Sequence, residues 1–173
     1  GDEMGQEVEL GETTASKANP ATVPTFTGTL AEGVHVVGGM GNALSVETSS
    51  GIVQMDTGPS GRRVDEMLGR LRELSDAPIR AIAYSHGHLG YNDAVHRWLE
   101  HSKSRGEPIP PTIAHENLVR RWRRYAETEG VQRYFIELQF RLPRGSMANR
   151  PLPMPLWKDC HTRHIGLNCK ESR

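Results

Sequence analysis

Two histidines separated by one residue, His86 and His88, stand in a short polar loop of the sequence. The apolar run before them, over 78–84, has the composition of a β-strand, and helical periodicity begins again at Ala94. Loops at the carboxyl ends of strands carry the ligand sites of open α/β sheets. Neutral imidazole is the commonest side-chain metal ligand and suits zinc, iron, copper or nickel. The loop therefore indicates a metal site, and the alternative is a pair of polar residues that end a strand.

A catalytic zinc takes three protein ligands and keeps one position open, so two histidines are an incomplete set. His115 follows a later strand candidate and is a candidate for the same cleft. His161 and His164 lie further downstream, and the spacing selects neither as the third ligand. Cys160 and Cys169 match no zinc-finger pattern. We therefore expect the metal site at His86 and His88 and none at the cysteines.

Composition limits the classes of function. The 173 residues fit one domain, and a hydrophobic content of 36% is low enough that part of the chain is expected to be unpacked. The formal net charge of +0 gives no argument for binding nucleic acid or an anionic membrane. No apolar run approaches the roughly 18 residues of a membrane helix, and no signal-peptide pattern is present. We expect no membrane partner and a cytoplasmic location.

The order of the predicted elements is that of an α/β domain. Apolar or alternating runs predict strands over 34–37, 43–48, 52–55, 78–84 and 112–114. An apolar stripe predicts a helix over 61–74 that packs on the sheet, with Ser60 as its N-cap. A strand, a helix and a strand in this order imply a parallel pair with a right-handed crossover.

Further helices are expected over 94–103 and, with a break at Gly130, up to about 140. We divide the chain into a flexible amino-terminal arm over 1–24, a domain over 25–142 and an irregular tail over 143–173.

A basic cluster with interleaved aromatics runs from Arg120 to Tyr125. Such a cluster is one sign of nucleic-acid binding. On a helix, however, Trp122 and Tyr125 share one face, and the stems of the arginines flank it. We favour a solvated helix face and predict no nucleic-acid partner.

Three features occur in an order that resembles the amino-terminal half of the metallo-β-lactamase fold. They are a strand pair that ends in Asp56-Thr57-Gly58, a helix, and a strand that ends in Ser85-His86-Gly87-His88. The resemblance covers about residues 28–115 and is closest to the alkyl-sulfatase-like and general metallohydrolase branches. It implies an α/β fold, the metallo-β-lactamase-like αββα sandwich, present here as its amino-terminal half with an irregular carboxyl-terminal tail.

The resemblance also implies metal-dependent hydrolysis of a small-molecule ester, lactone, lactam or sulfate, with metal-activated water as the nucleophile. His86 and His88 match the first two ligands of the family's first metal site, for which zinc is expected and iron is the second option. Asp56 matches the aspartate beside the metal centre. Asp56 and Asp93 are the candidate catalytic residues that would orient the water.

The chain also departs from the family pattern. Gly90 and Tyr91 stand where the family has the aspartate and histidine of the second metal, and Asp93 comes three residues late. The alternative function is therefore that of a truncated or degenerate non-catalytic protein that acts through partner binding. Half a sandwich leaves a sheet face and edge uncovered, so a truncated product, a variant carboxyl end and a homo-oligomer all fit. Tyr91 and Asn92 are substrate-binding candidates, with a cap for the helix at Ala94 as the alternative for Asn92.

Overall fold

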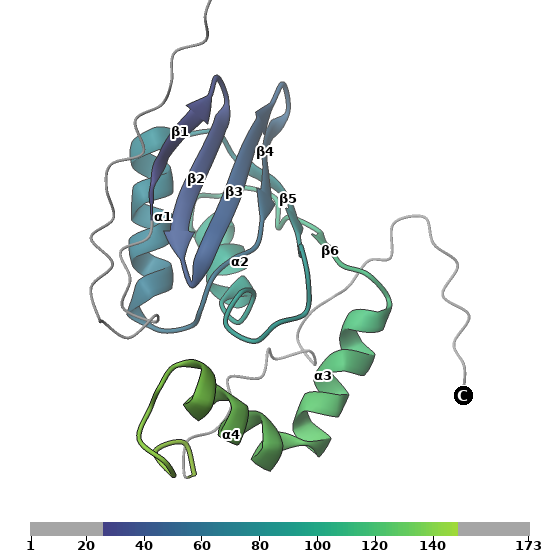
Figure 1. Cartoon of the computed structure of the whole chain (residues 1–173). Helices are drawn as coiled ribbons and strands as arrows, with labels where there is room; N and C mark the ends of the chain where they lie inside the picture. The colour runs from purple at the N-terminus through teal and green to yellow at the C-terminus, as the bar shows by residue number, and fades with distance from the viewer. Residues whose placement is uncertain (1–25, 149–173) are drawn as a thin grey trace, which may run out of the picture.

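One mixed sheet and four helices make up the computed structural model, which describes residues 26–148 (Figure 1). The strands lie side by side in chain order. They are β1 (Gly28–Ala31), β2 (Val34–Gly39), β3 (Gly41–Thr48), β4 (Gly51–Met55), β5 (Ile79–Ala83) and β6 (Thr112–Ile113). The helices are α1 (Arg62–Leu74), α2 (Val95–Ser104), α3 (Asn117–Glu127) and α4 (Glu129–Gln139).

Strand direction changes at β4. The strands β1 to β4 are antiparallel because tight turns join them, whereas β4, β5 and β6 are parallel because the chain crosses over through α1 and then α2. The predicted parallel pair on either side of the first helix is confirmed. The edge strand β1 was not predicted, since its residues are mostly exposed and show no alternation of apolar and polar side chains.

Two local predictions were wrong. The N-cap of α1 is Gly61, with φ at 87° and no side-chain hydrogen bond, so Ser60 does not cap this helix. The break between the last two helices falls at Thr128, and Gly130 lies inside α4. At Thr128 the backbone leaves the helical conformation (φ −110°, ψ 25°), and the Thr128 hydroxyl donates to the carbonyl of Arg124 at the end of α3.

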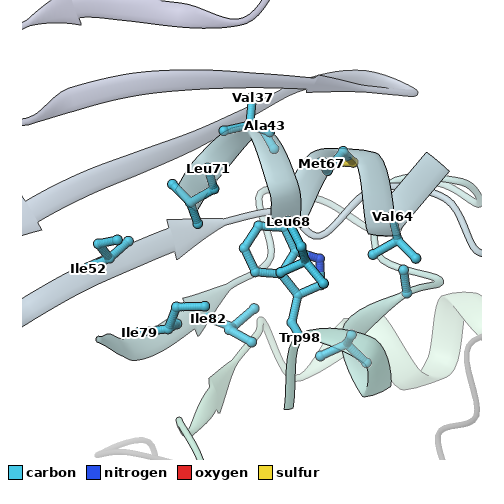
Figure 2. Packing of buried hydrophobic residues seen from close by; sticks show 12 residues of the cluster. Val37, Ala43, Ile52, Val64, Met67, Leu68, Leu71, Ile79, Ile82 and Trp98 are labelled. Atoms are coloured by element: carbon cyan, nitrogen blue, oxygen red, sulfur yellow. The ribbon is translucent and has the colours of Figure 1, made fainter. Parts of the chain in front are cut away.

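The core lies between the sheet and the two crossover helices. Val64, Met67, Leu68 and Leu71 repeat at helical spacing along α1 and are buried, as the sequence predicts. Figure 2 shows them facing the apolar side chains of the sheet and of α2, which are Val37, Ala43, Ile52, Ile79, Ile82 and Trp98. This packing fixes α1 and α2 against β4 and β5, and therefore also fixes the loops that follow these two strands.

The opposite face of the sheet is apolar and, within the described residues, no helix lies over it (Figure 1). Cross-strand register places its side chains in two rows. One row is Gly28, Val36, Leu44, Met55, Ala83 and Ile113, and the other is Ala31, Val34, Val46, Val53 and Ala81. We call this surface the open face. No helix of residues 26–148 covers this face, as expected from half a sandwich, although Val36 within it is buried and Met55 and Ile113 are its only exposed large apolar side chains, at 40% and 41%.

The last helix carries a second exposed apolar surface. Side chains one helical turn apart on α4 are each about half exposed; they are Val131, Tyr134, Phe135 and Leu138. After α4 the chain turns back, and the Glu137 carboxylate accepts the amides of Gly145 and Met147. None of the four described helices has the length and apolarity that a bilayer crossing needs. The predicted arm over 1–24, the tail from 149 onward, both cysteines and His161 and His164 lie outside the described residues.

Candidate functional site

Two loops meet at the carboxyl ends of β4 and β5. Because these strands are parallel neighbours, the loop 56–58 and the loop 85–93 emerge at the same end of the sheet. The amides of Thr57 and Gly58 both donate to the carbonyl of Tyr91, at 3.1 and 2.7 Å. The buried indole of Trp98 donates to the carbonyl of Thr57 at 2.9 Å. The core therefore fixes the two loops to each other.

Asp56 is the buried charge at the centre of this arrangement. Its backbone adopts φ 61°, the left-handed region that aspartate tolerates better than most residues. Its carboxylate accepts the Ser85 amide at 2.9 Å, the Asn92 side-chain amide at 2.6 Å and the Ser85 hydroxyl. These donors replace the water that burial removes, and all of them come from the loop after β5. Asp56 is thus bound to the histidine loop, and its assignment as a residue that orients water remains a prediction.

Ser85 connects Asp56 to His86. The Ser85 hydroxyl proton is donated to Asp56, so the Ser85 oxygen acts as acceptor toward His86 Nδ1, which lies 2.7 Å away. In the neutral form of the His86 ring, this contact places the proton on Nδ1 and leaves the lone pair of Nε2 free. A hydrogen bond of this kind to the far nitrogen is the usual support of a metal-binding histidine.

His86, His88 and Tyr91 form a cluster of rings, which we call the ring cluster. The centroids of His86 and His88 are 4.8 Å apart, and the Tyr91 ring lies 4.3 Å from His86 and 6.2 Å from His88. Two imidazoles on one tetrahedral zinc ion have centroids about 5 Å apart. Partial burial, followed by the charges of Arg121 and His86, lowers the pKa of His88. The ring separation matches that of two imidazoles on one ion, and the lowered pKa of His88 favours its neutral form.

The described residues supply no third ligand. Across 26–148, no group of three or more histidine, cysteine, aspartate or glutamate side chains is placed to hold a metal ion. His115 is exposed, and its Nδ1 accepts the amide of Asn117 at 3.1 Å. The pair fits two positions of a zinc site, and the set is incomplete in this part of the chain.

Asp93 is held by its own loop. Its Oδ2 accepts the Gly90 amide at 2.9 Å, and its Oδ1 is buried without a hydrogen-bond partner among the described residues. Burial raises the pKa of Asp93 to about 6, although the Gly90 amide opposes this shift. Its catalytic assignment remains a prediction, and the observed contact gives it a role in closing the turn.

The two residues that replace family ligands fit the turn sterically. Gly90 has φ 90°, and a Cβ there would lie 2.2 Å from Met40 Sδ. The Tyr91 ring packs on Gly41, where a Cβ would lie 2.5 Å from the ring. Glycine at position 90 therefore lets the β2–β3 turn pack against the histidine loop.

Asn92 and Ser85 have roles in the fold that were not predicted from the sequence. Asn92 is fully buried between the loops and its Oδ1 accepts the Thr57 amide, so it does not cap α2, which begins after Ala94 without a side-chain cap. Burial also removes it from the substrate-binding candidates. The role of Ser85 could have been predicted, since its hydroxyl directly precedes the first histidine in the sequence.

Comparison with solved structures finds metallo-β-lactamase-fold proteins. The chain is similar to a Cronobacter sakazakii metallo-β-lactamase with a HARLDQ motif, at 22% identity over 58% of this chain and 35% of that chain, with a TM-score of 0.48. A subclass B3 metallo-β-lactamase of Bradyrhizobium japonicum matches at 20% identity over 57% and 36%, with a TM-score of 0.45. A β-lactamase domain protein from Burkholderia ambifaria matches at 14% over 69% and 40%, also with a TM-score of 0.45.

Each of these proteins is similar to part of this chain, as the resemblance in the sequence led us to expect. The predicted mixed α/β fold class is observed directly in the six-stranded sheet and its helices. The chain spans well under half the length of these proteins, so their activities are not carried over to it. No family model and no curated protein matches the chain.

Proposed function

We propose that the chain is a metal-dependent hydrolase whose metal is held by His86 and His88. The observation that carries this proposal is the hydrogen-bond chain from Asp56 through Ser85 to His86. A buried carboxylate that fixes the tautomer of an imidazole beside a second imidazole supports metal binding. Zinc is the favoured ion because neutral imidazole suits it, and iron is the second option.

A bound divalent ion would supply Lewis acidity and a water molecule of lowered pKa. The residues of the chain have separate tasks. Asp56 stabilises a proton on Nδ1 of His86 through the Ser85 hydroxyl, and the Asn92 amide holds Asp56 in place through Oδ1. Tyr91 packs against His86 and limits the rotation of its ring. His88 would supply the second imidazole ligand, since its ring lies beside that of His86.

The substrates are small esters, lactones, lactams or sulfate esters, the classes that the resemblance implies. A panel of chromogenic esters, a lactone, a lactam and an aryl sulfate tests this proposal with protein as purified, after chelation, and after return of zinc. We expect turnover that chelation abolishes and zinc restores. Turnover that is unchanged by chelation would overturn the assignment of a metal-dependent reaction.

The open face supports a second candidate, a non-catalytic protein that acts through partner binding. Its two rows contain only apolar residues and glycine, and Met55 and Ile113 are 40% and 41% exposed. Most other members are partly exposed and Val36 is buried, so Met55 and Ile113 are the accessible large apolar groups of this face. Exposed apolar patches of this kind can mark interaction sites. A protein that binds no metal, hydrolyses no member of the panel and associates through this face would match the second candidate.

A further inference from the structure

Arg121 on α3 lies against the residue between the two histidines. A Cβ on buried Gly87 would lie 2.9 Å from Arg121 Cδ and 3.7 Å from Arg121 Nε, and 2.8 Å from Leu118 Cδ1. Glycine at position 87 therefore permits the approach of α3 to the histidine loop. The arginine comes from a part of the chain more than 30 residues away, so the fold itself brings a cation beside the ring cluster.

Tyr125 holds the guanidinium in place. Arg121 Nε donates to the Tyr125 hydroxyl at 2.9 Å, and the Arg121 Cζ lies 5.3 Å from the centroid of the Tyr125 ring. This contact uses Nε and the face of the guanidinium. The two terminal nitrogens of exposed Arg121 have no hydrogen-bond or ion-pair partner within residues 26–148.

Within residues 26–148, Arg121 also forms no ion pair with a carboxylate. Some arginines of the described region pair with carboxylates, as Arg97 does with Asp65 and Arg105 with Glu107, and Arg121 is among those that do not. Of the two carboxylates of the site, Asp56 is buried and already accepts three hydrogen bonds from Ser85 and Asn92. Asp93 is also buried, and it accepts the Gly90 amide. A positive group beside the histidines is therefore left for an anion from solution. The planar fork of a guanidinium matches the two oxygens of a carboxylate.

We propose that Arg121 binds a carboxylate group of the substrate next to His86 and His88, so that the enzyme prefers anionic substrates. This inference rests on the proposed function for its catalytic meaning, and it names the substrate class. The carboxylate site itself needs no metal, because its described parts are Arg121, Tyr125 and the glycine that lets them approach.

The test is a titration of the full chain with benzoate, with benzamide as the neutral control, followed by the amide NMR signal of Gly87. It is carried out on protein as purified and again after chelation, which removes benzoate binding to a metal. We expect benzoate to shift the Gly87 signal in both preparations and benzamide to leave it unchanged. Arg121→Gln should weaken benzoate binding about tenfold or more, the loss expected for hydrogen bonds to a charged group.

Arg124→Gln is the matched control, since Arg124 is exposed on the same helix one turn later, and its loss changes the net charge equally. Benzoate binding should survive this change. Equal weakening of benzoate binding by both variants would show diffuse attraction to the helix and would overturn the proposal. Benzoate binding that Arg121→Gln leaves intact would also overturn it. So would binding of benzamide as strong as that of benzoate.

Failure of this proposal is distinct from failure of the proposed function. A protein that holds metal and hydrolyses neutral and anionic esters equally would contradict the role of Arg121 alone. A protein that binds benzoate through Arg121 but holds no metal would contradict the hydrolase and leave the carboxylate site in place.

Discussion

The side-chain amide of Asn92 donates to the carboxylate of Asp56 at 2.6 Å, across 36 residues of sequence. Both side chains are almost completely buried. This hydrogen bond joins the loop after β4 to the loop after β5, and it holds the carboxylate that in turn bonds to Ser85. The geometry of the histidine pair therefore depends on a residue that touches neither histidine in the described contacts.

Replacement of Asn92 tests this relationship. Asn92→Ala removes a hydrogen bond to a buried charge, which is expected to lower the free energy of unfolding by about 2 kcal/mol. Asn92→Asp places a second carboxylate beside Asp56, so it should destabilise more at pH 7 and recover as the pH falls and one of the two carboxylates is protonated. Urea unfolding at pH 5 and pH 7 measures both variants. Equal stability of parent and Asn92→Ala would show that the bond is unimportant.

Ser85 is expected to control metal affinity through His86. Ser85→Ala disconnects Asp56 from His86, and the loss of such a supporting partner typically costs 10- to 100-fold in metal affinity, roughly. Ser85→Thr keeps the hydroxyl and is the matched control. Zinc affinity, measured by competition with a chelator, and the NMR shifts of the His86 ring nitrogens distinguish the effects of Ser85→Ala and Ser85→Thr. An unchanged tautomer and affinity in Ser85→Ala would contradict the role assigned to Ser85.

Asp93 is expected to make stability depend on pH. Its pKa is about 6 in the folded chain, against an ordinary value of about 4, so between these pH values the folded state binds more protons than the unfolded state. Stability from this group is therefore complete below about pH 4 and is lost as the pH rises through 6, by up to about 3 kcal/mol.

Asp93→Asn removes this dependence, because asparagine is neutral and can still accept the Gly90 amide. The variant and the parent should be similarly stable near pH 4, and the variant should be the more stable at pH 7. Thermal unfolding across this range measures the difference. If the parent instead became more stable relative to the variant as the pH rises, the pKa of Asp93 would not be raised by burial, and the prediction would be wrong.

The open face is expected to cause self-association or dye binding. Met55→Gln places a polar amide in the middle of one apolar row, where the side chain is 40% exposed. We expect weaker binding of a hydrophobic dye and a smaller apparent mass by light scattering, with little change in stability. Ile109→Gln, at a more exposed apolar residue in the loop before β6, is the control and should leave both signals unchanged.

The sequence predicts the part of this fold that is fixed by periodicity. The apolar spacing of α1, the alternation in β3 and the strand before the histidines all appear within one or two residues of their predicted positions. Periodicity did not reveal β1, which is an edge strand with exposed side chains, or the end of α3 at Thr128, where a side-chain hydroxyl caps a carbonyl.

Within the candidate site, the residue types identify His86 and His88, and the residues that organise them are less visible. The Asp56–Ser85–His86 connection depends on the register between two parallel strands, which a local pattern does not contain. The approach of Arg121 depends on how α3 packs after β6. Such contacts between distant segments follow from the packed fold, and spacing along the chain cannot supply them.

Metal content per chain tests the central claim most directly. Protein purified without chelator is compared with His86→Ala/His88→Ala by elemental analysis, with circular dichroism to confirm that the variant is folded. We predict close to one zinc or iron ion per chain in the parent and none in the variant. A parent without metal after zinc is supplied, or a folded variant that retains it, would contradict a metal centre at His86 and His88.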